Sequence, residues 1–200
     1  LYVDDLDQAD RVAEEAIRLG NATGQYPAVV FGAVVRSVVA RSNGRVAEAI
    51  RYAEDAVRIA DRERGETRHR HPQLWLGRAL VAADRFDEAA IIYSAGQREA
   101  DRIGTAWSKP LWHYYRAEML VAAGCLEDAR AELESGVRVT EELNARQLGV
   151  ALRGLLARVA LRSGDPAAAA RLIEQAQSLL SDHVSVGPVD LTWPTALLHE

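Results

Sequence analysis

Few residues of this sequence have the types and spacing that chemistry requires. His69 and His71 stand two residues apart, but no third histidine or cysteine lies at ligand spacing, so the sequence predicts no metal site. The one cysteine, Cys125, falls at the start of an expected helix, a position known for reactive thiols. It occupies a repeated structural position, however, and we therefore do not expect it to be a nucleophile.

Sequence motifs for catalysis and cofactor binding are missing. The chain has no G-x-x-x-x-G-K-[ST] phosphate loop, no G-x-G-x-x-G after a strand, no H-E-x-x-H and no G-x-S-x-G. The acidic pairs Glu14-Glu15 and Glu141-Glu142 fall on expected helix surfaces, where solvated carboxylates are common. We therefore predict no catalytic residue, no cofactor and no enzymatic activity.

The composition is that of a soluble cytoplasmic protein. Of 200 residues, 48% are hydrophobic and 26% are charged, and the net charge is −5, which argues against a nucleic-acid-binding surface. A single cysteine cannot form an internal disulfide. The longest apolar run, residues 28–40, is interrupted by Arg36 and is shorter than the ~20 residues of a membrane span. The acidic N-terminus is unlike a signal peptide, and we expect neither membrane nor direct nucleic-acid contact.

A repeat of 40 residues organises the whole chain. Six-residue segments that end in alanine begin at residues 4, 44, 84, 124 and 164, with no insertion between them. Small residues recur seven positions after that alanine, on the same face of its helix, and seven positions before each segment, on the preceding helix and facing the same contact. They are Ala16, Ala56, Gly96, Gly136 and Ala176 after it, and Ser37, Gly77, Ala117 and Ala157 before it.

Each repeat reads as helix A, a tight turn and helix B. Gly44, Gly124 and Gly164 are suited to a helix C-cap with positive φ, and Pro166 to the first turn of a helix. Helices A are expected at 27–42, 72–83, 109–123 and 146–163, and helices B at 6–19, 46–64, 86–103, 126–143 and 166–180. The prediction is an all-α, right-handed superhelical solenoid of antiparallel helix pairs, forming one domain over residues 1–200.

The small-residue columns resemble the tetratricopeptide (TPR) signature, although the aromatic of helix A and the closing proline are mostly absent. The period of 40 exceeds the usual ~34. This longer variety is similar to the sensor regions of large bacterial transcriptional activators, namely LuxR-family regulators with an ATPase core and the maltose-regulator type. Segments 100–104 and 141–146 carry that likeness.

The resemblance implies a ligand-sensing or protein-interaction scaffold from a bacterial transcriptional regulator. Two alternatives stay open: a stand-alone adaptor that binds peptide segments, and an accessory helical domain of a larger enzyme. We expect the chain to be a fragment of a longer protein, because Leu1 is not Met and residues 195–200 begin a new apolar helix. The exposed ends of such a solenoid also predict self-association.

The resemblance implies that helix A lines the concave face and binds a peptide, a protein or a small-molecule effector there. Spacings of three and four place the candidate residues on one stripe of each helix. They are Phe31, Val34, His71, Leu74, Arg78, Tyr114, Glu118 and Arg158. The alternative interpretation is that Arg78 and Glu118 pair across adjacent repeats and that Tyr114 only packs.

Two further clusters are open to a functional and a structural interpretation. Arg62, Arg64 and residues 68–71 are able to bind an anion, or they form a solvated loop balanced by nearby acids. The second cluster is aromatic and consists of Trp75, Trp107, Trp112, Tyr114 and Tyr115. Its members form a binding hot spot or fill gaps between helices, and the second interpretation is favoured for Trp75.

Overall fold

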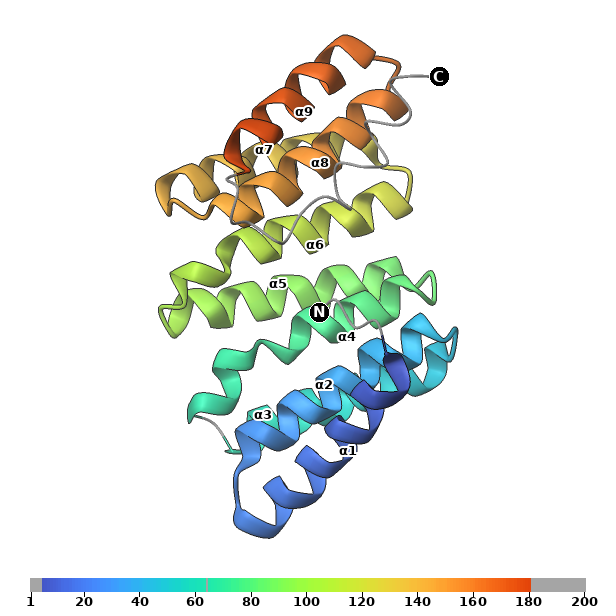
Figure 1. The fold of residues 1–200 in the computed structure, drawn as a ribbon, viewed down its shortest axis with the longest axis vertical. Coiled ribbons are helices and arrows are strands. Elements are labelled where there is room, and N and C mark those ends of the chain that lie inside the picture. Colours follow the sequence, from blue (N-terminus) through green and yellow to red (C-terminus); the bar gives the residue numbers. More distant parts are fainter. Residues whose placement is uncertain (1–4, 64, 181–200) are drawn as a thin grey trace. The chain divides into compact units, whose positions relative to one another are not determined.

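The computed structural model describes residues 5–63 and 65–180, and all regular structure in this part of the chain is helical. The helices are α1 (Leu6–Thr23), α2 (Tyr26–Ser42), α3 (Val46–Glu63), α4 (Pro72–Val81), α5 (Phe86–Arg102), α6 (Lys109–Ala122), α7 (Leu126–Glu142), α8 (Arg146–Arg162) and α9 (Pro166–Leu179) (Figure 1). The expected helices are confirmed, with ends that differ by a few residues at most. The turn expected near residue 4 and the helix expected at 195–200 lie outside the described residues.

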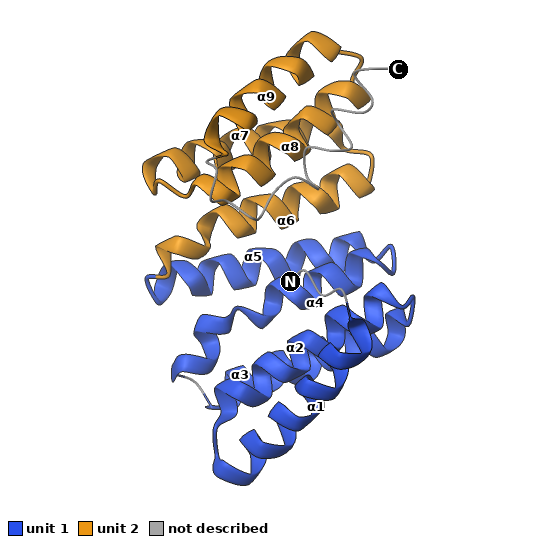
Figure 2. Cartoon of the chain, in the orientation of Figure 1, with its two compact units in different colours: residues 1–104 blue, residues 105–200 orange. Residues whose placement is uncertain are grey.

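The chain divides into two compact units, residues 1–104 and 105–200 (Figure 2). Among the described residues, unit 1 holds α1 to α5 and a 3₁₀ helix, η1 (Gly65–Arg70). Unit 2 holds α6 to α9, preceded by a short 3₁₀ helix, η2 (Ala106–Ser108). In each unit, consecutive helices pack in pairs, as in α2 with α3 and α8 with α9. No described helix is both long and apolar enough to cross a membrane.

The turns inside the helix pairs share one backbone geometry. Gly44, Gly124 and Gly164 have φ of 73°, 80° and 78°. The next residue donates its backbone N–H back across the turn, as Arg45 does to the Ala40 carbonyl at 2.8 Å. Glycine has no Cβ to strain in this left-handed conformation, so the prediction of glycine C-caps is confirmed. Asp84 adopts the same conformation in the α4–α5 turn, with φ of 55°.

The small-residue columns let helix A and helix B approach closely, and their sizes are complementary. Gly77 on α4 faces the buried ring of Tyr93 on α5, and a Cβ added at Gly77 would lie only 2.2 Å from that ring. In unit 2, Ala117 instead packs in one cluster with Leu133, the residue 40 positions after Tyr93. Where helix B carries a larger side chain, helix A therefore carries a smaller one, because the space between the helices is fixed.

Proline sets where several of the A helices begin. Pro72 is the first residue of α4, and Pro27 and Pro110 lie in the first turn of α2 and α6. The residue before a proline disfavours the α conformation, and proline itself needs no N–H donor partner in the first turn. Residues 65–70 therefore form η1 where α2 and α8 already form α-helix at the repeat-equivalent positions.

Candidate functional site

Three of the residues predicted to line the helix A stripe are buried instead. Val34 is 2% exposed and packs in a core cluster with Val30 and Ala56, while Leu74 is 3% exposed. His71 is 2% exposed and lies at the start of α4. These three side chains therefore offer almost no surface to a ligand, and binding at them stays a prediction.

The reason for this burial is the environment of helix A. In unit 1, α2 packs against α1, α3 and α4, so it is enclosed on three sides. A stripe chosen by spacings of three and four is therefore as much core as surface, because only a narrow strip of such a helix meets solvent. Phe31 lies on that strip and is 48% exposed.

His71 is a buried neutral histidine. Its backbone is in the left-handed region, with φ of 47°, and it caps α4 immediately before Pro72. Burial, and secondarily the charge of His69, lower the pKa of His71 from 6.5 to about 4. Among the described residues, no group of three or more His, Cys, Asp or Glu side chains is placed to hold a metal ion.

The remaining candidates lie in both units. In unit 1, the guanidinium of half-buried Arg78 lies 5.7 Å from the centre of the Trp75 ring, and Trp75 packs against the Val34 cluster. In unit 2, Tyr114 packs against the core around Leu133 and meets Tyr115 edge-on at 5.3 Å. Glu118 and Arg158, also in unit 2, are half-buried. Binding at Phe31, Arg78, Tyr114, Glu118 and Arg158 stays a prediction.

The basic loop before α4 is largely neutralised by acidic neighbours. Arg62 donates to Glu63 at 2.6 Å, and Arg68 donates to Glu99 on α5 at 2.7 Å. Glu99 also accepts two hydrogen bonds from Arg102. These hydrogen bonds, and then the charges of Arg102 and Arg68, lower the pKa of Glu99 to about 2. These pairs favour the structural interpretation, and the ion pair of Arg68 with Glu99 links η1 to α5.

The tryptophans differ in their environment. Trp112 is fully buried, and its indole N–H donates to Ser108 at 3.3 Å, so it fills the core of unit 2. Trp75 packs against a core cluster, as expected. Trp107, by contrast, is 57% exposed. The free thiol of Cys125 is exposed, with only a long 3.9 Å contact to the Ala123 carbonyl.

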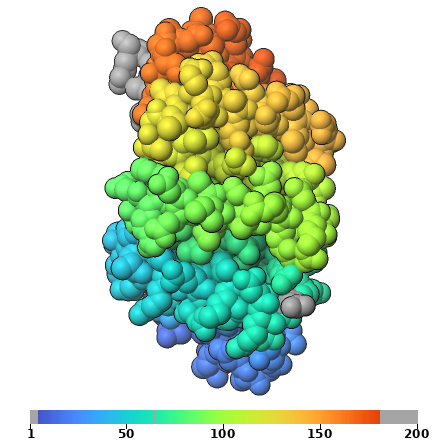
Figure 3. Space-filling model, turned by 180° about the vertical axis from the view of Figure 1, so that it is seen from behind, coloured from blue at the N-terminus to red at the C-terminus, as the bar shows by residue number. Residues whose placement is uncertain are grey.

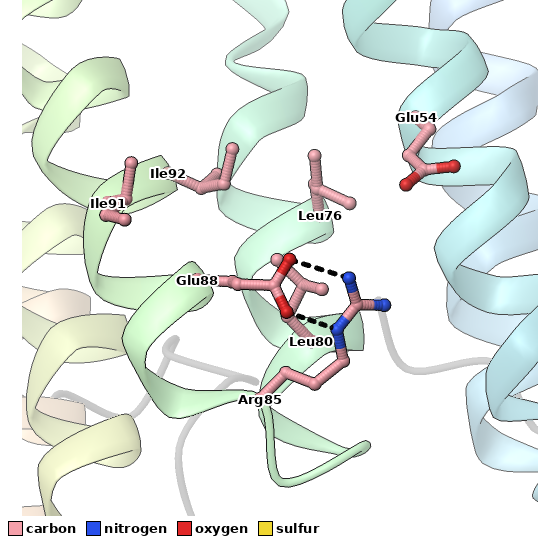
Figure 4. Close-up of a pocket in the computed structure, with 7 residues that line it drawn as sticks. All are labelled: Glu54, Leu76, Leu80, Arg85, Glu88, Ile91 and Ile92. Carbon is pink, nitrogen blue, oxygen red and sulfur yellow. Dashed lines mark hydrogen bonds and ion pairs between the residues drawn. The ribbon is translucent and has the colours of Figure 1, made fainter.

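An apolar pocket in unit 1 lies on the helix B side, where no site was expected. It has a volume of about 210 Å³ and is lined by Glu54 of α3, Leu76 and Leu80 of α4, and Arg85, Glu88, Ile91 and Ile92 at the start of α5 (Figure 4). Leu76 and Leu80 are 6% and 3% exposed and form the floor, while Ile91 is 67% exposed at the rim. Viewed from behind, unit 1 shows atoms of both α3 (cyan) and α5 (green) at its surface (Figure 3).

Charged side chains form the other edge of the pocket. Arg85 donates from Nε and Nη2 to the two carboxylate oxygens of Glu88, at 2.6 and 2.7 Å. These hydrogen bonds lower the pKa of Glu88, so the pair is fully ionised near neutral pH. Glu54 lies on the opposite wall and raises the pKa of Arg85 through its charge, after the larger effects of Glu88 and burial. The pocket thus joins an apolar floor to a charged rim.

A second hollow in unit 1 has a different character. It measures about 480 Å³ beside α1 and is lined by Ile17 and by five charged residues. These are Arg11, Glu14, Glu15, Arg18 and Arg36. Five of its six lining residues are charged, and it has no floor of buried leucines like that of the Leu76 pocket. The Leu76 pocket is therefore the stronger candidate for docking an aliphatic side chain of a partner.

The sequence did contain a signal for the Leu76 pocket. Residues 40 positions before and after Leu76 are Arg36 and Arg116, and those 40 before and after Ile91 are Arg51 and Ala131. A leucine and an isoleucine thus stand where neighbouring repeats have arginine or alanine. This departure from the repeat is visible in the sequence, but it lies off the stripe of helix A on which binding was predicted.

Known structures share this architecture. No family model and no curated protein matches the sequence. Among solved structures, BtubC (BKLC) from P. vanneervenii matches 96% of this chain and 80% of its own, with a TM-score of 0.74 and 18% identity. The nearly identical TPR-like repeats of a kinesin light chain-type protein of Podosopora anserina match 87% of this chain and 86% of their own at 20% identity, in two structures with TM-scores of 0.62 and 0.59. The predicted TPR-like helical solenoid is confirmed.

Proposed function

We propose that this chain is a protein-interaction scaffold that docks an aliphatic side chain of a partner protein in the Leu76 pocket. The observation that carries the proposal is the pairing of a buried leucine floor with Ile91, which remains 67% exposed at the rim. A partner side chain that covers Ile91 would remove apolar surface from water. Anchors of this kind, seated in a pocket with a polar rim, supply most of the free energy of protein association.

The size of the pocket favours a side chain over a free small molecule. Sites for small molecules usually measure about 300–1,000 Å³. The Leu76 pocket, at about 210 Å³, is below that range. It is large enough for the aliphatic part of a leucine, isoleucine or methionine that is supplied by a longer segment.

Selection of peptides tests this proposal directly. A library of random 12-residue peptides displayed on phage is selected on the immobilised wild-type chain and counter-selected on Ile91→Gln. Glutamine keeps the helix and a similar length but makes the rim polar. We expect enriched peptides with a leucine, isoleucine or methionine that bind the wild-type chain at least fivefold more tightly than Ile91→Gln.

The matched control is Val12→Gln, which alters another aliphatic residue of a B helix with 63% exposure. Peptides selected on the wild-type chain should bind Val12→Gln unchanged. The proposal is overturned if selection yields no peptide that discriminates wild type from Ile91→Gln, or if Val12→Gln weakens binding equally.

We also propose that the chain acts without catalysis and in the cytoplasm, as a segment of a transcriptional regulator. The charge balance and the absence of catalytic motifs from the sequence support the first two points. Segments 100–104 and 141–146 support the third through their resemblance to regulator arrays. The coding sequence around this segment tests the third point, since an upstream nucleotide-binding domain and a downstream helix-turn-helix are expected.

Self-association remains a separate prediction, and a monomer by light scattering at high concentration would contradict it.

A further inference from the structure

The Leu76 pocket carries a carboxylate whose charge reaches Arg85 but forms no ion pair with it. Both oxygens of Glu88 are occupied by Arg85. Glu54, on the facing wall, makes no hydrogen bond or ion pair with any other residue in the described ranges 5–63 and 65–180. Glu54, Glu88 and Arg85 together therefore leave the rim with one surplus negative charge.

The preceding repeat shows what such a carboxylate binds. Glu14 lies 40 residues before Glu54, and its Oε1 is 3.9 Å from Nη1 of Arg36. Arg36 in turn lies 40 residues before Leu76, the floor of the pocket. The groove over α2, beside Glu14 and Arg36, thus holds an internal guanidinium next to its carboxylate. The equivalent groove over α4, which contains the Leu76 pocket, keeps the carboxylate as Glu54 but has leucine in place of that arginine.

We infer that the partner segment supplies the missing cation: a lysine or arginine, close to its aliphatic anchor, pairs with Glu54. This inference rests on the proposed function, because the anchor brings the cation to the rim. The aliphatic side chain contacts Leu76, Leu80 and Ile91, and the cation lies at the rim beside Glu54. A paired carboxylate adds selectivity for basic partners more than affinity, because the rim is exposed to solvent.

The test uses the phage-selected peptides against charge variants of the full chain. The inference predicts a lysine or arginine at a constant distance from the aliphatic residue in the enriched sequences. Glu54→Gln should weaken those peptides about threefold, as expected for one exposed ion pair. Glu54→Lys should weaken them about tenfold and should favour peptides in which the basic residue is replaced by glutamate.

Glu134→Gln is the matched control, because Glu134 occupies the same repeat position on α7, is exposed and lies outside the pocket. It should leave binding unchanged. Peptides that depend on Ile91 but bind Glu54→Gln and Glu54→Lys as tightly as wild type would overturn the inference while the proposed function stands. Peptides that do not depend on Ile91 would overturn both.

Discussion

The grooves over α2 and over α4 are built from the same repeat, but Arg36 and its charged partners line the first, whereas the second has an apolar floor. In the first, Arg36 donates to Asp10 of α1 at 3.0 Å, and its guanidinium lies 4.6 Å from the centre of the Tyr52 ring of α3. In the second, the repeat-equivalent residues are Leu76, Ile50 and Ile92. The backbone repeat therefore does not determine the chemical character of the groove. Three side-chain positions decide it, by replacing an ion pair and a cation–π contact with aliphatic groups.

The electrostatics of the two grooves follow the same division. Burial opposes the charge of Arg36, but the hydrogen bond and charge of Asp10 outweigh it, so the pKa of Arg36 is raised. Its side chain is 22% exposed and that of Asp10 is 31% exposed, so this pair is partly shielded from solvent. Arg85 and Glu88, in contrast, are both exposed and lie at the rim of the groove over α4. The charged pair is thus partly buried in the first groove and solvated at the rim of the second.

The largest expected difference between the two repeats is a response to pH. His71, which directly precedes α4, is buried, whereas the repeat-equivalent residue in α2 is the exposed Phe31. Unfolded His71 binds a proton below about pH 6.5, but folded His71 does so only near pH 4. As the pH falls through this window, the unfolded state gains the proton first, and the free energy of unfolding should fall by about 3 kcal/mol.

Urea denaturation at pH 7 and pH 4 measures this effect in the wild type and in His71→Asn, since asparagine tolerates the left-handed conformation. The variant should lose about 3 kcal/mol less than the wild type between these pH values. Equal losses would show that His71 does not titrate as its burial requires.

The next largest effect concerns the contact between Gly77 and Tyr93, which has no counterpart of that size at Ser37 and Ala53. Gly77→Ala would place a Cβ 2.2 Å from the Tyr93 ring, and overpacking should cost about 2 kcal/mol of folding free energy. Tyr93→Leu reproduces the leucine found at position 133 and makes room. The double variant Gly77→Ala/Tyr93→Leu should therefore be more stable than the sum of the single losses predicts. Simple additivity in a double-mutant cycle would show that the two side chains do not share this space.

A smaller effect on stability is expected when the groove over α2 is given the leucine that stands in the groove over α4. Arg36→Leu removes the ion pair with Asp10 and the contact with Tyr52, and it should cost about 1 kcal/mol by urea denaturation. The loss should shrink when the wild type and the variant are compared in about 1 M salt, because the ion pair is then screened. A loss that is independent of salt would indicate that Arg36 contributes through packing alone.

The smallest effect on stability is expected at the rim of the groove over α4. Arg85→Gln breaks the hydrogen bonds to Glu88, but both side chains are solvated, so the midpoint of thermal unfolding should not change measurably. A clear loss of stability would mean that the rim pair holds α5 in place and does not merely border the pocket.

The fold was predictable from the sequence because the same structural residues recur at the same positions in successive repeats. Five alanines at a spacing of 40, and glycines at three of the turns, fix helix register and helix ends by themselves. The site was less predictable. Val34 and Leu74 have the helical spacing of a surface stripe, but their burial depends on three neighbouring helices that spacing on one helix does not reveal. The Leu76 pocket arises from α3, α4 and α5 together, and only its departure from the arginine column was visible beforehand.

Methyl NMR spectroscopy tests most directly whether the groove over α4 is the docking pocket. The chain is labelled at isoleucine Cδ1 and titrated with a phage-selected peptide that discriminates wild type from Ile91→Gln. The pocket predicts large shift changes at Ile91 and Ile92, with Ile17 and Ile59, which pack against the core beside α2, left unchanged. Changes at Ile17 and Ile59, with none at Ile91 and Ile92, would contradict it and place binding beside α2 instead.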